Sequence, residues 1–283
     1  MAAQTIIITG ANRGLGLSCA TALAQQGHRI ILAVRDITSG QDAKALIMAK
    51  IPTAKVEVLE LDVTSMESIA NFIKNLPSQI DILINNAGMY SKTANLIDFA
   101  GKKLEKVWVT NYFGPAYLTM QLLPKLKGGK VVNVCSVVGH KQKLDPQSVF
   151  ESKEIAYRQS KYANLLFVQI GKKIFPEVTW VGAHPGFSAT NIFSGRKTTW
   201  WQKITNKFIP HIAQSSDNGA LPIIAAAIEQ NQSGDYYVPR GLFELWGKSK
   251  KLADNSYYQL DDIEELWRLT ERMLDINRGL NLL

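Results

Sequence analysis

Tyr157 and Lys161 are residue types that could carry out acid–base chemistry, although a lone Tyr-x-x-x-Lys spacing is common on helices. They lie four residues apart in a stretch of helical period near residues 154–175, so both side chains fall on one face of the expected helix. An ammonium about 4 Å from a tyrosine is worth ~4 kcal/mol at an effective dielectric near 20. It therefore lowers the tyrosine pKa from ~10 by up to roughly three units, less the desolvation of the lysine. The pair is a candidate proton donor, although each residue alone also fits the exposed face of an amphipathic helix.

A glycine-rich turn follows the first apolar run of the chain, where residues 9–16 read TGANRGLG. Glycines at a strand-to-helix turn permit positive φ and let a pyrophosphate approach backbone N–H groups, while the helix N-terminus contributes partial positive charge. The first gap differs by one residue from the commoner dinucleotide fingerprint, and by itself the turn also fits a purely steric role. The candidate phosphate-binding residues are Gly10, Asn12, Arg13, Gly14, Leu15 and Gly16.

The end of the second expected strand bears on which dinucleotide binds. Counting about twenty residues on from the last glycine reaches Asp36, an acid that would favour NAD. The strand itself ends at Val34, which cannot accept a hydrogen bond, and Arg35 follows with a planar fork suited to a phosphate. Loop lengths vary by a residue or two, so we give the strand end more weight. Arg35 together with Arg13 predicts NADP(H) in preference to NAD(H), unless both are ordinary solvated arginines.

The elements that must position these residues alternate between strand-length apolar runs and helical patterns. This alternation predicts an α/β fold with a doubly wound, mostly parallel sheet and helices on both faces. Seven strands are expected near residues 4–9, 29–34, 55–59, 80–84, 130–135, 178–183 and 236–238. Helices are expected near residues 15–26, 38–50, 65–76, 103–126, 154–175 and 215–229. No repeat or linker interrupts them, so residues 1–283 are expected to form a single dinucleotide-binding domain.

Two stretches interrupt the alternation. Residues 187–214 carry large aromatic side chains among cations, including Phe193, Trp200, Trp201 and Phe208. A short crossover would suffice there, so the segment indicates a lid over the carboxyl edge of the sheet. Trp200 and Trp201 suit an apolar substrate and raise the alternative of peripheral contact with an anionic membrane, although packing beneath the lid is favoured. Residues 261–276 have apolar positions at helical spacing behind an acidic first turn, which predicts a docked terminal helix.

Further chemistry-bearing segments follow the remaining strands. Together with the glycine turn, Tyr157 and Lys161, they resemble the short-chain dehydrogenase/reductase superfamily from residue 4 to about residue 241. This resemblance implies a Rossmann-type sheet and a nicotinamide cofactor. The segments that carry it at strand ends are Asp62 and Val63; Asn86, Ala87 and Gly88; Ser136; and Pro185 and Gly186, followed by Thr190.

The resemblance also implies a catalytic set of Asn111, Ser136, Tyr157 and Lys161. Reduction of a carbonyl places negative charge on its oxygen, so a proton donor and a hydrogen-bond donor must face that atom. Tyr157 and Ser136 would serve. In the family the lysine also bonds the nicotinamide ribose, and Asn111 would hold a water that passes protons to Lys161. Residues 137–156 form a longer insert than many family members show, and we expect a loop at the pocket rim.

The branch is indicated by residues 157–167, YRQSKYANLLF, and by His184-Pro185-Gly186. Both resemble the retinol-dehydrogenase-like and WW-domain-oxidoreductase-like branch. Protochlorophyllide reductases share much of this pattern, but they carry a longer insertion and a cysteine near the substrate, whereas Cys135 is expected inside a strand. A non-catalytic dinucleotide sensor of the same fold is the competing class, disfavoured by the complete catalytic set. The leading hypothesis is an NADP(H)-dependent oxidoreductase that reduces an apolar aldehyde or ketone, or runs the reverse reaction.

Composition limits the partners. Of 283 residues, 32 are Lys or Arg and 24 are Asp or Glu, giving a net charge of +8, which a phosphorylated cofactor explains in part. The sequence has no basic stripe with interleaved aromatic residues, so a nucleic-acid partner is not expected. It has no apolar run of about 18 residues, so a membrane span is not expected. Two cysteines in apolar runs and four scattered histidines predict no metal and a cytoplasmic enzyme. A small-molecule substrate is expected, and a homodimer remains an option because the family often pairs helices near residues 103–126 and 154–175.

Overall fold

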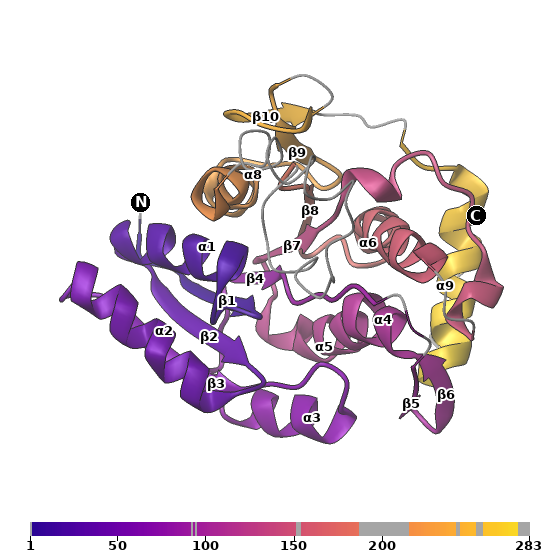
Figure 1. Ribbon diagram of the computed structural model, residues 1–283, viewed down its shortest axis with the longest axis horizontal. Helices are drawn as coiled ribbons and strands as arrows, with labels where there is room; N and C mark the ends of the chain where they lie inside the picture. Colours follow the sequence, from indigo (N-terminus) through magenta and orange to yellow (C-terminus); the bar gives the residue numbers. More distant parts are fainter. Residues whose placement is uncertain are drawn as a thin grey trace, which may run out of the picture.

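The computed structural model describes residues 2–91, 93, 95–150, 154–186, 215–241, 244–252 and 257–276. Its centre is an eight-stranded sheet with the strand order β10-β9-β8-β7-β4-β1-β2-β3 (Figure 1). The strands are β1 (Thr5–Thr9), β2 (Arg29–Val34), β3 (Lys55–Glu60), β4 (Ile82–Asn85), β7 (Lys130–Val134), β8 (Thr179–Ala183), β9 (Tyr236–Pro239) and β10 (Ser249–Leu252).

Every pair of neighbouring strands in this sheet is parallel except the last, in which β10 runs antiparallel to β9. The central strands are runs of Ile, Leu and Val, and Ile6, Ile7 and Ile8 have no exposed surface. Such strands form because branched side chains suit a pleated sheet that is covered on both faces. The mostly parallel α/β prediction is confirmed, and β10 adds one strand to the seven expected.

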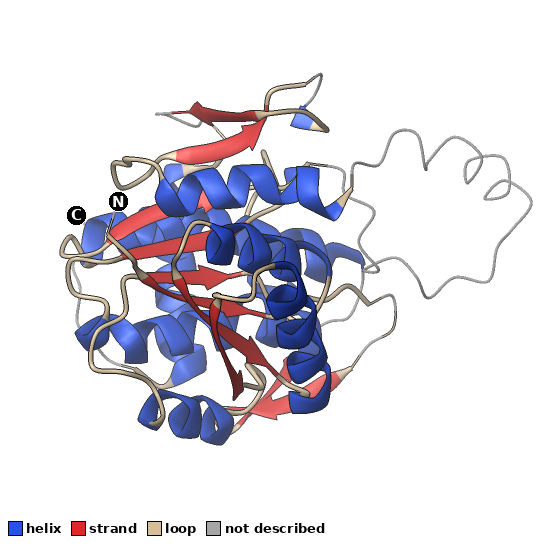
Figure 2. Ribbon diagram, turned by 90° about the vertical axis from the view of Figure 1, so that its left-hand side faces the viewer, coloured by secondary structure: helices blue, strands red, loops and turns tan. Residues whose placement is uncertain are grey.

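Helices cover both faces of the sheet (Figure 2). Buried side chains of α1 (Gly14–Gln25), α2 (Ile37–Lys50) and α8 (Ser216–Ile228) form the core on one face. Buried side chains of α3 (Met66–Lys74), α5 (Gly114–Leu122), α6 (Glu154–Ile174) and α9 (Leu260–Leu274) form the core on the other. No helix within the described ranges is long and apolar enough to cross a bilayer.

The helix expected over residues 103–126 is wrong at its start. Residues 102–105 form strand β6 (Lys102–Glu105), which pairs antiparallel with β5 (Leu96–Phe99) in a separate two-stranded sheet. Helix α4 (Lys106–Trp108) follows, with Glu105 as its cap: the carboxylate accepts a hydrogen bond from Val107 N at 2.5 Å. The chain then passes through a π-helical turn, η1 (Val109–Phe113), before α5 begins. The sequence does not distinguish this π-helical turn from an α-helix, because apolar and aromatic positions at helical spacing fit both.

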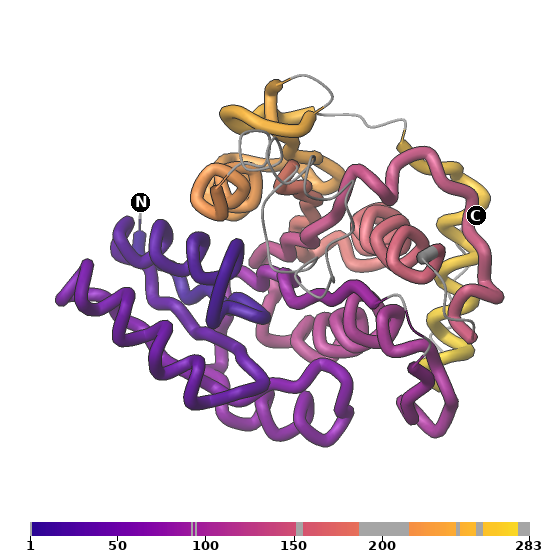
Figure 3. Tube along the Cα trace, in the orientation of Figure 1, coloured from indigo at the N-terminus to yellow at the C-terminus, as the bar shows by residue number. Residues whose placement is uncertain are grey.

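Helix α9 lies beside α6 in both the ribbon and the tube (Figures 1 and 3), and its apolar side chains enter the core. Two buried hydrogen bonds fasten it, and we call them together the α9 clamp. Tyr162 Oη of α6 donates to Asp262 Oδ2 at 2.6 Å, and Tyr112 Oη of η1 lies 2.7 Å from Thr270 Oγ1. Asp262 also accepts from Leu144 N at 3.1 Å. The predicted docked helix is therefore present, and the clamp reaches the immediate neighbours of Asn111 and Lys161.

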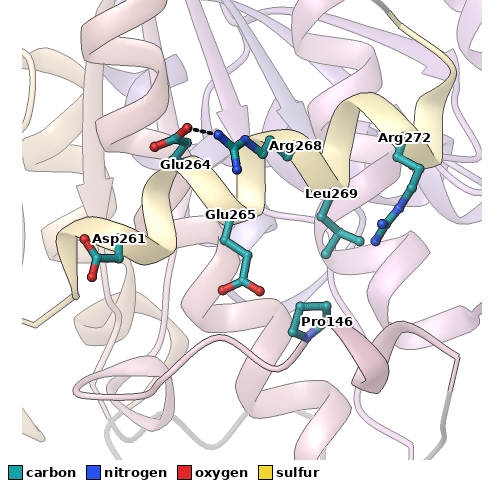
Figure 4. Close-up of a pocket in the computed structure, with 7 residues that line it drawn as sticks. All are labelled: Pro146, Asp261, Glu264, Glu265, Arg268, Leu269 and Arg272. Atoms are coloured by element: carbon teal, nitrogen blue, oxygen red, sulfur yellow. Dashed lines mark hydrogen bonds and ion pairs between the residues drawn. The ribbon is translucent and has the colours of Figure 1, made fainter. Parts of the chain in front are cut away.

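The outer face of α9 is polar (Figure 4). Glu264 and Arg268 form an ion pair one turn apart, beside a cavity of about 470 Å³ that Pro146 closes from the other side. None of the candidate active-site residues lines this cavity. One face of α9 is thus buried and carries the clamp residues, and the opposite face is polar and solvated.

Replacement of Asp262 by Ala should lower the free energy of unfolding by about 1–3 kcal/mol, because Tyr162 Oη and Leu144 N lose their common buried acceptor. Asp261→Ala is the matched control, since Asp261 is an exposed acid of the same first turn. Urea denaturation of the two variants measures the difference. Equal losses in both variants would contradict the clamp.

Candidate active site

The candidate residues gather at one edge because parallel strands all end there. β1 leads into the glycine turn, β2 into Arg35, β3 into Asp62, and β4 into the segment 86–88. β7 leads to Ser136, and β8 leads to Pro185 and Gly186. In open α/β sheets this carboxyl edge is where ligands bind. Thr190 and the expected lid over residues 187–214 lie outside the described residues.

The glycine turn and the segment after β4 are bonded into one unit. Asn86 Nδ2 donates to Thr9 O at 2.7 Å and to Gly10 O at 3.3 Å, and Thr9 Oγ1 accepts from the backbone N–H groups of Asn86 and Ala87. A Cβ on Gly16 would lie 2.5 Å from Gly10 O and 2.7 Å from Asn86 Nδ2. Gly10 and Gly14 have φ of +65° and +54°, a region that favours glycine. The turn therefore requires its glycines, as the sequence predicted.

The start of α1 has free donors. Arg13 is its N-cap residue and makes no capping bond, and the first turn contains no acid. The first backbone N–H groups of a helix have no partner within the helix, and together with the helix dipole they favour an anion. Asn12 is turned aside, since its Nδ2 donates to Ser39 Oγ of α2 at 3.0 Å. An uncapped helix start behind a glycine cradle fits the pyrophosphate of a dinucleotide.

The end of β2 separates the two nucleotide predictions. Val34 is buried, whereas Arg35 is exposed and makes no ion pair within the described part of the chain. Asp36, the acid that would favour NAD, caps α2 instead: its Oδ1 accepts from Thr38 N at 3.0 Å. Arg13 is likewise exposed. The acid near this strand end thus has a structural task, and the arginine does not.

The segment after β3 is fixed by its own bonds and by a close approach to α5. Asp62 Oδ1 accepts from Thr64 N at 2.8 Å and from Thr64 Oγ1 at 2.7 Å. The Val63 carbonyl lies so near Gly114 that any Cβ on that glycine would overlap it. Gly114 follows η1, so the position of Val63 is coupled to the turn that carries Asn111.

Lys161 is buried and its ammonium has a defined partner. Its Nζ donates to Val134 O, at the end of β7, at 2.9 Å. Burial lowers its pKa to about 8, against a smaller opposing effect of Cys135. Gly88 leaves space beside it, because a Cβ there would lie 3.6 Å from Nζ and 3.3 Å from Asn111 Oδ1. Lysine near its pKa at neutral pH can both hold and release a proton.

Tyr157 forms a hydrogen bond with Ser136. Burial raises the pKa of Tyr157, its hydrogen bond with Ser136 lowers it, and the charge of Tyr90 adds to the rise. The Tyr90 ring stands edge-on to Tyr157, with ring centroids 5.3 Å apart. The expected downward shift from Lys161 is therefore wrong for this arrangement. The lysine ammonium bonds the Val134 carbonyl instead, so burial outweighs any stabilisation of the tyrosinate.

Asn111 lies in η1 and fastens the loop after β4. Its Oδ1 accepts from Met89 N at 2.7 Å, while its Nδ2 donates to Met89 O at 2.9 Å and to Ser160 Oγ at 3.0 Å. Ser160 immediately precedes Lys161, so one amide joins the segment after β4 to α6. Met89, Ser160 and the Val134 carbonyl were not among the predicted residues. Of these, only Ser160 could have been found from the sequence, because it lies between Tyr157 and Lys161 of the motif.

Comparison with known proteins agrees with this arrangement. The family model described as short chain dehydrogenase matches residues 4–199. The chain is 36% identical to human (Homo sapiens) retinol dehydrogenase 12 over 252 residues, covering 83% of this chain and 77% of the relative. It is 33% identical to the short-chain dehydrogenase TIC 32 B, chloroplastic, of Brassica napus over 214 residues, 67% of this chain and 65% of that one. It thus spans less than two thirds of the latter relative's length.

Solved structures show the same fold. An uncharacterised protein of Mycobacterium paratuberculosis matches with a TM-score of 0.78 and 29% identity, over 99% of this chain and 96% of that one. Salutaridine reductase of Papaver somniferum matches with a TM-score of 0.62 and 20% identity, over 82% of this chain and 98% of that one, a similarity of fold alone. With the matched family model and the ordered motifs at the carboxyl edge, the chain belongs to the short-chain dehydrogenase/reductase family, in its retinol-dehydrogenase-like branch.

Proposed function

We propose that this protein is an NADP(H)-dependent oxidoreductase that interconverts an aldehyde or ketone with its alcohol. The observation that carries the proposal is the pairing of Tyr157 with Ser136 next to the buried Lys161, at the edge where α1 presents uncapped N–H groups. The relative retinol dehydrogenase 12 is named for the oxidation of an alcohol, which supports this alcohol–carbonyl reaction class.

The residues present fit a dinucleotide. The pyrophosphate would lie on the glycine turn and the α1 N-terminus, and Arg35 with Arg13 would meet a 2′-phosphate. Bound there, the nicotinamide group supplies or accepts the hydride. The other residues assigned to cofactor binding are Asp62, Val63, Asn86, Ala87, Gly88, Pro185, Gly186 and Thr190.

The proton chemistry belongs to the protein's own side chains. Ser136 and Tyr157 hydrogen-bond the carbonyl oxygen of the substrate, and Tyr157 Oη transfers its proton to that oxygen as the carbon is reduced. The raised pKa of Tyr157 keeps the phenol protonated at neutral pH. Lys161 then restores the proton, for which a pKa of about 8 is well placed. Asn111 holds the loop after β4 against α6 and so fixes the separation of the two.

Tyr157→Phe should lower kcat for NADPH-dependent aldehyde or ketone reduction by about 10²- to 10⁴-fold, because the proton donor is lost. NADPH binding, followed by nucleotide fluorescence, should persist. Loss of absorbance of NADPH in a screen of apolar aldehydes and ketones measures the rate. Tyr117→Phe is the control, since Tyr117 packs against Phe99 away from the site. Full activity in Tyr157→Phe would remove the assigned acid, and failure of the wild-type protein to bind either nucleotide would end the proposal.

The rate of reduction should fall as pH rises through about 8, because the protonated form of Lys161 that recharges Tyr157 disappears there. Above that pH, kcat should approach a tenfold loss per pH unit. Steady-state kinetics from pH 6 to about 10, with circular dichroism to confirm folding, provide the profile. A rate that stays constant across this range in folded protein would exclude Lys161 as the proton source.

Arg35→Ala should weaken NADPH binding by about tenfold or more and change NADH binding by less than about twofold, since only NADPH has a 2′-phosphate for the guanidinium. Arg29→Ala is the matched control at the other end of the same strand, where the arginine pairs with Glu57 at 2.8 Å. Fluorescence titration of both nucleotides gives the dissociation constants. Equal weakening of NADPH and NADH binding would contradict the assignment of Arg35.

A further inference from the structure

A second cavity, of about 420 Å³, lies at the carboxyl edge of the sheet. One wall includes Val137, which follows Ser136 directly, and another includes Arg240, which follows β9. Because β9 runs parallel to β8, its end lies at the same carboxyl edge as His184 and Gly186. The remaining lining residues that matter are His140, Glu244, Lys250 and Tyr257. None of these residues has a role in the proposed proton transfer.

The acidic group of the cavity is already bonded within the protein. Tyr257 Oη donates to Glu244 Oε1 at 2.7 Å, and the Tyr257 ring stacks on His140 with centroids 4.1 Å apart. Glu244 Oε2 lies 3.7 Å from His184 Nε2 and 4.0 Å from His140 Nδ1. The Glu244 carboxylate is therefore held by Tyr257 and lies close to both histidines.

The two histidines add no charge to the cavity. Burial lowers the pKa of His140 to about 4, and Lys141 adds to that effect. Burial also lowers the pKa of His184 to about 3, assisted by His140. Both imidazoles are therefore neutral at physiological pH. Within the described residues, no group of His, Cys, Asp and Glu could hold a metal ion.

Arg240 and Lys250 form no ion pair within the described part of the chain, and the Glu244 carboxylate that shares the cavity is bonded to Tyr257 instead. Arg240 N donates to Lys248 O at 2.8 Å, which continues the ladder in which Val238 faces Lys250. Arg240 and Lys250 are therefore diagonal neighbours on one face of the β9–β10 pair, a spacing of about 7–8 Å between backbones. Lys251 points to the opposite face and pairs with Asp235 at 3.3 Å. Two like charges side by side are unfavourable until an anion lies between them.

We propose that this cavity is a substrate subsite that binds a carboxylate, held between Arg240 and Lys250, at the far end of a carbonyl substrate. The inference rests on the proposed function, because the substrate carbonyl is placed at Tyr157 and Ser136. A guanidinium fork matches a carboxylate in two parallel hydrogen bonds, and the ammonium adds a point charge. The preferred substrates are then apolar aldehydes or ketones that end in a carboxylic acid.

The test uses a series of ω-oxo carboxylic acids of increasing chain length and their methyl esters, with NADPH and the full-length protein. Acid and ester share the reacting aldehyde and differ in the charge at the far end. The wild-type protein should show an optimum chain length with the acids, and there a KM about tenfold lower than for the matching ester. Arg240→Gln and Lys250→Gln should each raise the KM of the acid severalfold, leave that of the ester within about twofold, and leave kcat unchanged.

Two controls sharpen the result. Lys251→Gln removes one charge from the same strand on the opposite face and should leave both KM values unchanged. Arg240→Lys keeps the charge without the fork and should give an intermediate KM for the acid. Equal KM values for acid and ester in the wild type, or equal effects of the variants on both, would overturn the subsite. If the wild type reduces neither acid nor ester, the proposed function fails, and the two failures are thereby distinguished.

Discussion

The buried ammonium of Lys161 is the constraint on which the candidate site depends. Placing a cation inside a protein is costly unless a fixed acceptor meets it, and here that acceptor is the Val134 carbonyl. Burial lowers the pKa of Lys161 to about 8, because the carbonyl that meets the ammonium carries no full charge to offset the lost hydration. The site therefore depends on α6 lying close against the end of β7. Gly139 permits this approach, since a Cβ there would be 2.7 Å from the Lys161 carbonyl carbon.

The packing of α6 comes largely from segments distant in sequence. The α9 clamp holds Tyr162 and Tyr112, each of which is next to a candidate catalytic residue, and Asp262 also holds the segment between β7 and α6 through Leu144. Asn111 joins α6 to the loop after β4 through Ser160 and Met89. The position of α6, and with it the candidate catalytic geometry, thus depends on buried hydrogen bonds to several different segments. Such a network favours one position for α6.

The parts of this arrangement that have local signals in the sequence can be predicted from it. The glycine turn and the strand ends could be predicted because apolar runs and glycines mark where a buried parallel strand ends and a helix begins. The hairpin of β5 and β6 and the π-turn at Asn111 could not, since their residues carry the same apolar spacing as a helix. The bond between Tyr162 and Asp262 joins residues 100 positions apart, and no local pattern announces it. The pKa of Tyr157 likewise depends on packing, because burial raises it and Lys161 bonds the Val134 carbonyl.

The order of the strands also has a consequence for the molecule in a crowded solution. β3 and β10 are the outer strands of the sheet, and the outer edge of such a strand offers backbone groups to any strand that approaches. β3 carries Lys55, Glu57 and Glu60, and the four-residue β10 carries Lys250 and Lys251. Charged side chains on short edge strands oppose pairing with a second sheet, because their desolvation and mutual repulsion exceed the gain from a few ladder bonds. The same strand that brings Lys250 to the second cavity thereby protects the sheet from aggregation.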